Sequence, residues 1–439
     1  MRPSRWFVLL AAVAPALLRA PSLPAQDRAE RQSLDRAREM LRIVKRDIER
    51  EYYDSTYQGI DLAARYRVAD SVLGVSGSLP EMFAVISQFA ADLNDSHTRF
   101  LPPSQVARVQ YGFQWQLVGD SAYITRVQPQ SDAAAKGLAP GDRILGLDGM
   151  QVNRRTNRIV QYVYYTLRPR PGVRIAVEKP DRSQVQLDIL SRITQGVAIN
   201  DYTSMQDRGR MIREIEEGSF ASRHRWHAFG DSVLVWRMPA FRGGDEEGID
   251  EMMRRARGFR ALVLDLRNNG GGSVATMLRL IGSFFDRELP VAITRERSKV
   301  DTLVARPRDE PYRGEVMILI NSGSASASEI TSRTFQLQRR ATIVGDRSAG
   351  AVVVSRFFPH VVGFQRVYGY ATQISVMDLV MPDSSRLEGR GVTPDVPVLP
   401  TPADLAAERD PAMSVALNLV GVALNATDAA QLFRERRRD

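Results

Sequence analysis

The sequence of 439 residues contains no cysteine. Disulfide bonds are therefore excluded, and so is a lipid anchor on an N-terminal cysteine. The apolar run near its start is too short for a membrane span, and no later stretch reaches the roughly 20 apolar residues that a transmembrane helix needs. Lysine is scarce as well, because the chain has only Lys45, Lys136, Lys179 and Lys299. A site that depends on a lysine therefore has very few candidates.

The first residues have the pattern of a secretory signal peptide. Arg2 and Arg5 precede an apolar run from Trp6 to Leu18, and small residues follow as far as Ala25. Such a basic start, apolar middle and small-residue end are typical of a segment that is removed on export. We predict cleavage after Ala25 and a periplasmic or secreted protein with no membrane span in the mature chain.

The excess of basic residues is modest for a chain of this length. The formal charge is +9 at pH 7. Most arginines are interleaved with acidic residues, and only residues 434–439 form a basic cluster. Nucleic-acid binding needs a basic face or stripe, which the sequence does not show. We therefore predict no nucleic-acid partner and interpret the terminal cluster as a solvated tail.

Two segments combine a buried strand, a short polar turn and a helix. The apolar strand 316–320 leads into Ser-Ala-Ser-Ala-Ser-Glu at 324–329. A helix start has free backbone N–H groups and a positive dipole end, which can stabilise an oxyanion beside a hydroxyl. The strand 261–264 leads into three glycines at 270–272, where bare amides can approach a ligand. The alternatives are an ordinary N-cap and a tight turn. A phosphate-binding loop is not favoured because no lysine follows the glycines.

These turns, with Asp-Ser-His-Thr-Arg-Phe at 95–100 and Gly-Val-Thr-Pro-Asp at 391–395, resemble the tail-specific, or carboxyl-terminal-processing, serine proteases. The resemblance covers most of the chain. It implies that Ser326, the middle serine of its run, is a nucleophile that works without metal or cofactor. It also implies an oxyanion hole formed by the amides of Ala327 and Gly271, with Gly272 as the alternative to Gly271.

One departure from the family pattern concerns the general base. The processing proteases carry a lysine 25 positions after the nucleophile, and this chain has Ala351 there. The Ser96-His97 pair is similar to the Ser-His dipeptide of the tricorn core protease, and Glu388 stands where that relative has a glutamate. The resemblance therefore implies that Ser326 attacks, that His97 takes and returns the proton, and that Glu388 and Ser96 orient the imidazole.

Each of these assignments has a plainer alternative. The residues Asp-Ser-His-Thr are typical of a turn, so His97 could be a loop histidine that is hydrogen-bonded to the backbone. Glu388 lies in a polar stretch where a solvated carboxylate is common. The leading function is an exported serine endopeptidase. The competing function is that of a catalytically inactive relative that binds peptides or other ligands. In that case Ala351 marks the position of a lysine base that has been lost. A hydrolase of small esters or amides is the third possibility.

A middle segment resembles a PDZ domain. The resemblance rests on residues 133–145 with Asp148-Gly149, and Tyr111-Gly112-Phe113-Gln114 matches the carboxylate-binding loop. A PDZ groove accepts an extended chain as an added strand and binds its terminal carboxylate with loop amides. Unstructured polypeptide C-termini are therefore the implied ligands and substrates. The alternative is a module that acts only as a spacer or gate.

The pattern as a whole predicts an α/β multi-domain protein. Alternating strands and helices between 230 and 400 predict a mainly parallel sheet with catalytic loops at the carboxyl ends of its strands. His97 must then come from another domain. The predicted parts are a signal peptide (1–25), an N-terminal helical domain (27–104), a PDZ-like β-rich domain (105–192), a linker (193–231), a protease core (232–404) and a C-terminal helix and tail (405–439).

His224 and His227 are three positions apart, a spacing that could hold a metal on one face of a helix. No carboxylate or cysteine framework accompanies them, so we predict no metal site. The sequence gives no indication of the oligomeric state.

Overall fold

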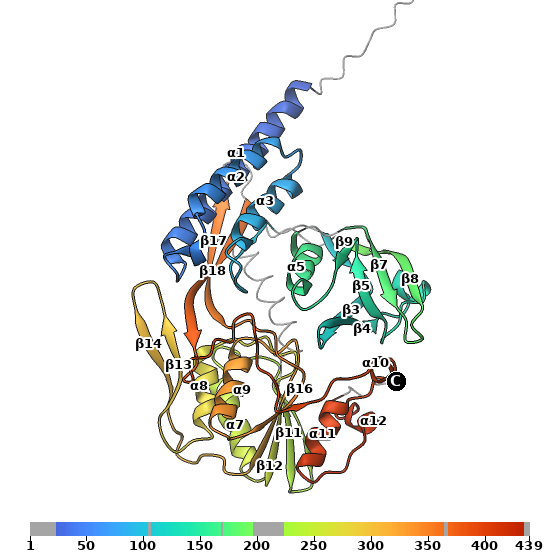
Figure 1. The fold of residues 1–439 in the computed structure, drawn as a ribbon, viewed down its shortest axis with the longest axis vertical. Coiled ribbons are helices and arrows are strands. Elements are labelled where there is room, and N and C mark those ends of the chain that lie inside the picture. Colours follow the sequence, from blue (N-terminus) through green and yellow to red (C-terminus); the bar gives the residue numbers. More distant parts are fainter. Residues whose placement is uncertain (1–22, 104–106, 168–169, 196–223, 364–367, 434–439) are drawn as a thin grey trace, which may run out of the picture.

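The computed structural model describes residues 23–103, 107–167, 170–195, 224–363 and 368–433 (Figure 1). Most of the predicted signal peptide and the basic C-terminal cluster lie outside these ranges, and the first described helix begins at Leu23. Within the described ranges, no helix has both the length and the apolar content to cross a membrane. The predicted fold class is confirmed: N-terminal helices, a β-rich PDZ-like part and an α/β core are all present.

The core is built on a six-stranded sheet with the strand order β10-β11-β12-β15-β16-β19. All neighbours after the antiparallel β10–β11 pair run parallel, as the alternating pattern predicted. The strands are β10 (Arg225–Phe229), β11 (Val233–Arg237), β12 (Ala261–Asp265), β15 (Glu315–Ile320), β16 (Thr342–Gly345) and β19 (Val396–Pro397).

Helices cover both faces of this sheet because successive strand residues point to opposite sides. On one face Leu262 and Leu264 are buried with Ile330, under helices α7 (Glu246–Ala256), α8 (Val274–Gly282) and α9 (Ala327–Leu337). On the other face Val263 is buried with Met413 of α11 (Pro411–Leu419). The short helices α10 (Pro402–Ala406) and α12 (Ala426–Ala429) flank α11.

A second sheet joins the core to the N-terminal helices. Its strand order is β1-β18-β13-β14, and β17 pairs with β18. The hairpin of β17 and β18 rises out of the core and lies against the N-terminal helices (Figure 1). The elements are β1 (Arg99–Leu101), β13 (Leu289–Arg295), β14 (Val300–Ala305), β17 (Val353–Val362), β18 (Tyr368–Val380), α1 (Leu23–Glu51), the 3₁₀ turn η1 (Tyr57–Gly59), α2 (Leu62–Val75) and α3 (Leu79–Ala91).

This hairpin was not predicted from the sequence, and it decides where the His97 loop lies. Strand β1 begins two residues after His97 and pairs with β18, with Arg99 opposite Gln373. Tyr370 and Ile374 of β18 are buried with Leu41 and other apolar residues of the helices. The loop is therefore held by β18, a strand that continues into the core, although the first strand of the core sheet begins at Arg225, 128 residues after His97 (225 − 97).

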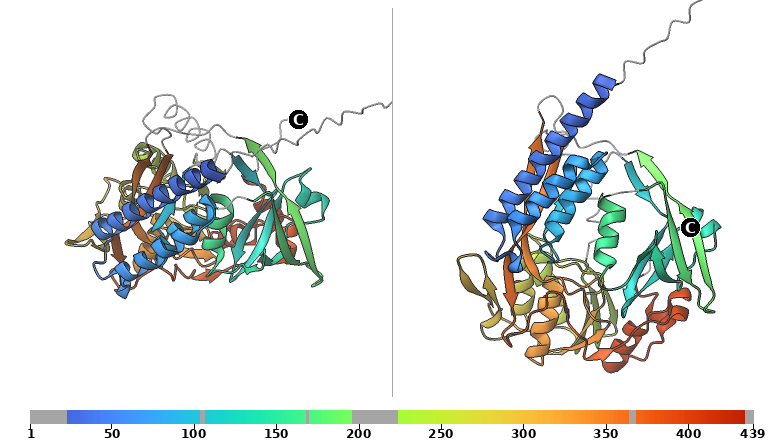
Figure 2. Two further views of the ribbon diagram at one scale, coloured as in Figure 1. Left: turned by 90° about the horizontal axis from the view of Figure 1, so that it is seen from above. Right: turned by 45° about the horizontal axis from the view of Figure 1, so that its top comes forward.

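The PDZ-like part has its own sheet and its own apolar core. Its strand order is β3-β4-β5-β7-β8, with β6 paired to β5, so β3 lies at an edge. Helix α5 lies between the N-terminal helices and this sheet (Figure 2). The elements are β2 (Ala107–Gln110), β3 (Phe113–Val118), β4 (Ser121–Val127), α4 (Asp132–Ala135), β5 (Arg143–Leu147), β6 (Met150–Gln151), α5 (Asn157–Tyr162), the π-helical turn η2 (Val163–Leu167), β7 (Gly172–Glu178), β8 (Gln184–Leu190) and β9 (Arg192–Gln195), which pairs with β2.

Candidate active site

Ser326 lies at the carboxyl end of β15, directly before α9, in the predicted place. Its backbone has φ 55° and ψ −118°, a conformation that non-glycine residues rarely adopt. Such a conformation costs on the order of 1–3 kcal/mol and persists only where surrounding contacts enforce it. The Ser326 N–H donates to the carbonyl of Ala351 (3.0 Å) and to Oε2 of Glu329 (3.0 Å). A strained strand-to-helix turn of this kind exposes a nucleophilic hydroxyl.

The loop that carries His97 is fixed by a buried carboxylate. Asp95 Oδ1 accepts hydrogen bonds from the N–H groups of His97 (2.8 Å) and Thr98 (2.6 Å). The hydroxyl of Ser375, in β18, donates to the same oxygen (2.8 Å). These hydrogen bonds of the turn involve the backbone N–H of His97, so its imidazole remains available for other contacts.

The structure brings Ser96, His97 and Glu388 together although Glu388 is 292 residues from Ser96. Ser96 Oγ lies 2.6 Å from His97 Nδ1 and donates to Oε2 of Glu388 (2.9 Å). The N–H groups of Ser96 (2.8 Å) and Val352 (2.6 Å) also donate to this carboxylate. Glu388 is therefore partly buried and fully engaged, in contrast to the solvated carboxylate that its polar sequence neighbourhood allowed.

This arrangement determines where the proton of His97 resides. A hydroxyl has one hydrogen and an ionised carboxylate can only accept, so Ser96 Oγ donates to Glu388 and must accept from Nδ1–H. Nε2 is then unprotonated. It makes no hydrogen bond with any residue that the structure describes, Ser326 included. Burial lowers the pKa of His97 to about 4; the charges of Arg99 and Arg158 act in the same direction and that of Asp95 opposes them. His97 is thus a neutral base at pH 7.

Ser326 and the Ser96–His97–Glu388 group are joined through two consecutive residues, 351 and 352. The carbonyl of Ala351 accepts from Ser326 N–H, and Val352 N–H donates to Glu388. Burial raises the pKa of Glu388, whereas its bonds with Val352 and Ser96 lower it. The position at which relatives have a lysine thus contributes its backbone, but no amine, to the site.

The glycine loop lies directly against Ser326. Gly271 has φ 93°, and a Cβ on it would lie 2.6 Å from Cβ of Ser326. The Gly271 N–H donates to Oδ1 of Asn269 (2.9 Å). Within the described ranges, the N–H groups of Gly272 and Ala327 have no acceptor. The geometry therefore favours the amide of Gly272, the alternative to Gly271 considered from the sequence, as the second oxyanion-hole donor beside the amide of Ala327.

The loop 111–114 leads into β3 at an edge of the PDZ-like sheet. Gly112 has φ 78°, and a Cβ on it would lie 2.5 Å from Cβ of Ser131. Tyr111 and Phe113 are buried in the PDZ-like core, and Gln114 is exposed. Because β3 begins at Phe113 and lies at the edge of its sheet, a peptide can add to it as a further strand.

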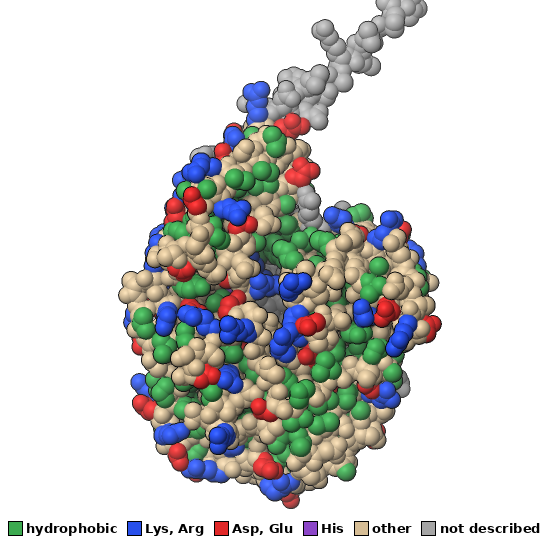
Figure 3. Space-filling view, viewed as in Figure 1, with side chains coloured by type: hydrophobic (Ala, Val, Ile, Leu, Met, Phe, Trp, Pro, Cys, Tyr) green, Lys and Arg blue, Asp and Glu red, His purple; other side chains and the backbone are tan. Residues whose placement is uncertain are grey.

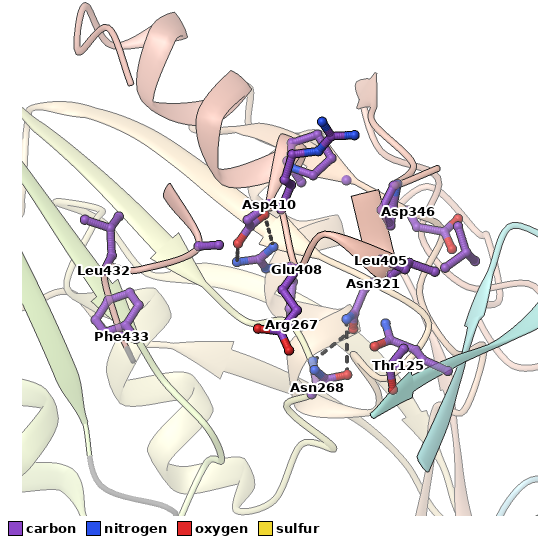
Figure 4. A pocket seen from close by; sticks show the side chains of 18 of the residues that line it. Thr125, Arg267, Asn268, Asn321, Asp346, Leu405, Glu408, Asp410, Leu432 and Phe433 are labelled. Atoms are coloured by element: carbon purple, nitrogen blue, oxygen red, sulfur yellow. Dashed lines mark hydrogen bonds and ion pairs between the residues drawn. The ribbon is translucent and has the colours of Figure 1, made fainter. Parts of the chain in front are cut away.

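A cavity of about 1690 Å³ separates the PDZ-like sheet from the carboxyl ends of the core strands (Figure 4). Asn268 and Asn321 lie on its wall and bond to each other, since Asn268 N–H donates to Oδ1 of Asn321 (2.9 Å). They directly precede the glycine loop and the serine run. Neither Ser326 nor His97 lines the cavity, which borders the loops that lead to them. Figure 3 shows a separate hollow with basic side chains at its edge, where the helices, the PDZ-like part and the core meet.

The two histidines 224 and 227 do not form a metal site. His227 lies in strand β10 and His224 directly before it, so the prediction that both could lie on one face of a helix is wrong. Nε2 of His224 bonds to Asp245 (2.8 Å), and Trp236 Nε1 donates to its Nδ1 (3.0 Å). In the described part of the chain, no group of three or more histidine, cysteine, aspartate or glutamate residues could hold a metal ion.

Three residues that contact the site were given no role from the sequence. In the sequence, Asp95 is one residue of the Asp-Ser-His-Thr motif and Glu329 is the last residue of the serine run. A glutamate three residues after an N-cap serine is a capping-box signal that could have identified Glu329. Arg154, in the PDZ-like part, donates to the carbonyls of Ser348 (2.9 Å) and Gly119 (2.8 Å) and so joins that part to the loop before Ala351. No sequence signal indicated this contact.

Comparison with known proteins gives two family matches. Residues 232–398 match the peptidase family S41, and residues 109–189 match the PDZ domain. The chain is 24% identical over 371 residues to carboxyl-terminal-processing peptidase 2, chloroplastic, of Arabidopsis thaliana, covering 80% of this chain and 67% of the relative. It is 25% identical over 310 residues to the tail-specific protease of Haemophilus influenzae, covering 67% of this chain and 42% of the relative.

Among solved structures, mature CPAF complexed with lactacystin has a similar fold. The TM-score is 0.64 at 16% identity, and the match covers 91% of this chain and 99% of that one. At this identity the likeness concerns the fold alone.

Proposed function

We propose that this protein, whose residues 232–398 match the peptidase family S41 and whose residues 109–189 match the PDZ domain, is an exported serine endopeptidase that cleaves polypeptides through an acyl-enzyme on Ser326. The observation that carries the proposal is the hydrogen-bonded group Glu388–Ser96–His97, which leaves an unprotonated Nε2 on a neutral imidazole. This group supplies the base that Ala351 cannot. It is joined to the Ser326 backbone through residues 351 and 352.

In the proposed reaction, Nε2 of His97 takes the proton of Ser326 Oγ as that oxygen attacks the scissile carbonyl. The amides of Gly272 and Ala327 donate to the oxyanion of the tetrahedral intermediate. His97 then gives the proton to the leaving amine, and water releases the acyl group by the same steps in reverse order. Ionised Glu388, acting through Ser96, stabilises the imidazolium and keeps the proton of neutral His97 on Nδ1.

Before substrate binds, Ser326 Oγ and His97 Nε2 are not hydrogen-bonded to each other. Catalytic hydrogen bonds are often long in unliganded enzymes and shorten in the complex with substrate. One residue of the PDZ-like part contacts the loop that carries His97, and another contacts the loop 348–351, which is hydrogen-bonded to Ser326. Arg154 donates to the carbonyl of Ser348, and Arg158 donates to the carbonyl of Asp95 (3.1 Å). The relative placement of the PDZ-like part and the core therefore affects the distance between Ser326 Oγ and His97 Nε2.

We further propose that substrates are unstructured polypeptide C-termini. The support is the loop 111–114 at the edge strand β3, where an extended peptide can pair with the strand and place its carboxylate against loop amides. The cavity between this sheet and the core is larger than most small-molecule sites, which suits a polypeptide segment. The signal-peptide pattern up to Ala25 supports export.

A fluorophosphonate probe tests the chemistry directly. We expect labelling of the wild type between about pH 6 and 9, because an activated serine needs a working base in this range. Labelling should be lost in Ser326→Ala and reduced about 10³-fold in His97→Ala. The matched controls are Ser183→Ala and His227→Ala, which lie outside the site and should be labelled like the wild type.

The outcomes separate the competing functions. An unlabelled wild type that binds peptides with free C-termini, but not their amidated forms, would make the protein a peptide-binding relative. Labelling that survives His97→Ala but not Ser326→Ala would keep the nucleophile and refute the base. Cleavage of small esters but not of peptides would favour the small-substrate hydrolase.

A further inference from the structure

Glu329 is a fully buried carboxylate that accepts four hydrogen bonds around the nucleophile. Its Oε2 accepts from the N–H groups of Ser326 (3.0 Å) and Ala351 (2.9 Å). Its Oε1 accepts from Gly350 N–H (2.8 Å) and from the hydroxyl of Ser348 (2.6 Å). One side chain of α9 therefore joins the backbone of Ser326 to the loop 348–351.

The same loop is also bonded to the segment that carries Glu388. Ser348 Oγ accepts from Val392 N–H (2.6 Å), and the carbonyl of Gly350 accepts from Gly389 N–H (2.9 Å). The packing at this point is close, because a Cβ on Gly350 would lie 2.9 Å from the backbone nitrogen of Arg390. Glu329 thus lies between the nucleophile and the segment that holds the third member of the catalytic group.

We propose that Glu329 is a positioning residue, whose carboxylate keeps Ser326 in its strained conformation and fixes the loop 348–351 so that the hydroxyl can meet His97. The proposal rests on the proposed function of Ser326 and adds to it a residue with no contact to the reacting atoms. In this chain the loop 348–351 has no lysine side chain that could contact Ser326. Glu329 instead holds the backbone of that loop next to Ser326.

A capping box accounts for the bond from Ser326 N–H to Glu329, but not for the three donors from the loop 348–351. A buried carboxylate is costly unless it is well paired, and a residue whose only role is packing is usually apolar. The donors come from the two segments whose relative position sets the geometry of attack. The charged groups of the segments packed around Glu329 are Arg333, Asp346, Arg347, Glu388 and Arg390, and none of them is hydrogen-bonded to it.

The protonation state of Glu329 should therefore affect reactivity. Four donors are matched only by the ionised carboxylate, because a protonated carboxyl presents a hydrogen to one of them. Burial raises the pKa of Glu329 to about 7, although the bonds from Ser348, Ala351, Gly350 and Ser326 lower it. Reactivity should rise with pH as Glu329 ionises. Glu329→Gln is neutral at every pH, so it should behave like the wild type with Glu329 protonated.

The test is the second-order rate constant of fluorophosphonate labelling between about pH 5.5 and 9. We expect the wild-type rate to rise through pH of about 7. At pH 8.5, Glu329→Gln should be about 100-fold slower, the loss expected when a reacting group is misplaced by about 1 Å. At pH 5.5 the two rates should converge, and the step near pH 7 should be absent from the variant. With a peptide substrate, kcat should fall while KM changes little.

Two controls separate positioning from folding. Glu315→Gln changes an exposed glutamate of β15 and should leave the profile unchanged. Ile330→Val weakens the core beside Glu329 and should lower the thermal midpoint without removing the step in the profile. If Glu329→Gln is labelled at the wild-type rate at pH 8.5, or keeps the step near pH 7, the proposal is wrong. A wild type that is not labelled through Ser326 would instead overturn the proposed function.

Discussion

Replacing Glu388 with glutamine should reverse the direction of the hydrogen bonds that set the tautomer of His97. In the wild type, the carboxylate accepts from Ser96 Oγ, Ser96 N–H and Val352 N–H. A glutamine has one accepting oxygen and an NH₂ group that donates. Ser96 N–H bonds to Oε1 and Val352 N–H bonds to Oε2, so one of these two donors must face the NH₂ group of the glutamine. With the NH₂ group at the Oε2 position, Ser96 Oγ accepts from it and donates to Nδ1. Nε2 then carries the proton and cannot act as a base.

The size of the effect follows from the number of bonds that change. Glutamine has almost the volume of glutamate, so packing is preserved, and the loss arises from the wrong tautomer and an unstabilised imidazolium. Wrong-tautomer variants of serine hydrolases lose about 10⁴ in turnover. Because Ser96 lies between the carboxylate and the imidazole, we expect a loss of about 10³ to 10⁴. This corresponds to about 4–5 kcal/mol of transition-state stabilisation at about 1.36 kcal/mol per tenfold change.

The assay is the rate of fluorophosphonate labelling at pH 8, with thermal unfolding measured on the same samples. Glu247→Gln, on the exposed start of α7, is the matched control and should react like the wild type. The midpoint of unfolding of Glu388→Gln should remain within a few degrees of the wild type, which assigns the lost rate to chemistry. A labelling rate within threefold of the wild type would refute the tautomer argument and the role of Glu388.

Substitutions at three positions test other contacts of the site. Ser326→Gly should be more stable than Ser326→Ala by about 1 kcal/mol in denaturant unfolding, because glycine relieves the strain at φ 55°; equal stability would contradict the strain. Gly271→Ala should lose labelling about 100-fold and destabilise the core by about 1–3 kcal/mol, since its Cβ would lie 2.6 Å from that of Ser326; an unchanged rate would show that the loop can move. Arg154→Ala should slow labelling about tenfold, and Arg154→Lys should not restore the rate because lysine lacks the planar fork that reaches the carbonyls of Ser348 and Gly119. Rescue by lysine would point to charge alone.

The core of the fold could be predicted because its signals are local. Strands β12 and β15 are apolar runs that end in glycine- or serine-rich turns, and the helices after them have a clear apolar period. Such patterns involve neighbouring residues and need no tertiary contact to be recognised. The long β17–β18 hairpin was missed, because an exposed strand such as β17 alternates weakly and draws its stability from pairing with β18.

The sequence by itself determined that a hydroxyl lies at a strand-to-helix turn beside a glycine loop, since chain connectivity and local propensity are sufficient to place Ser326 there. Only the tertiary structure decided that Ser96, which contacts His97, also meets Glu388, because the loop is placed by β1 pairing with β18 across more than 270 residues. It likewise decided which amides are free and that Glu329 binds the loop of Ala351. Hydrogen bonds between distant segments depend on how whole domains pack, and no local pattern encodes them.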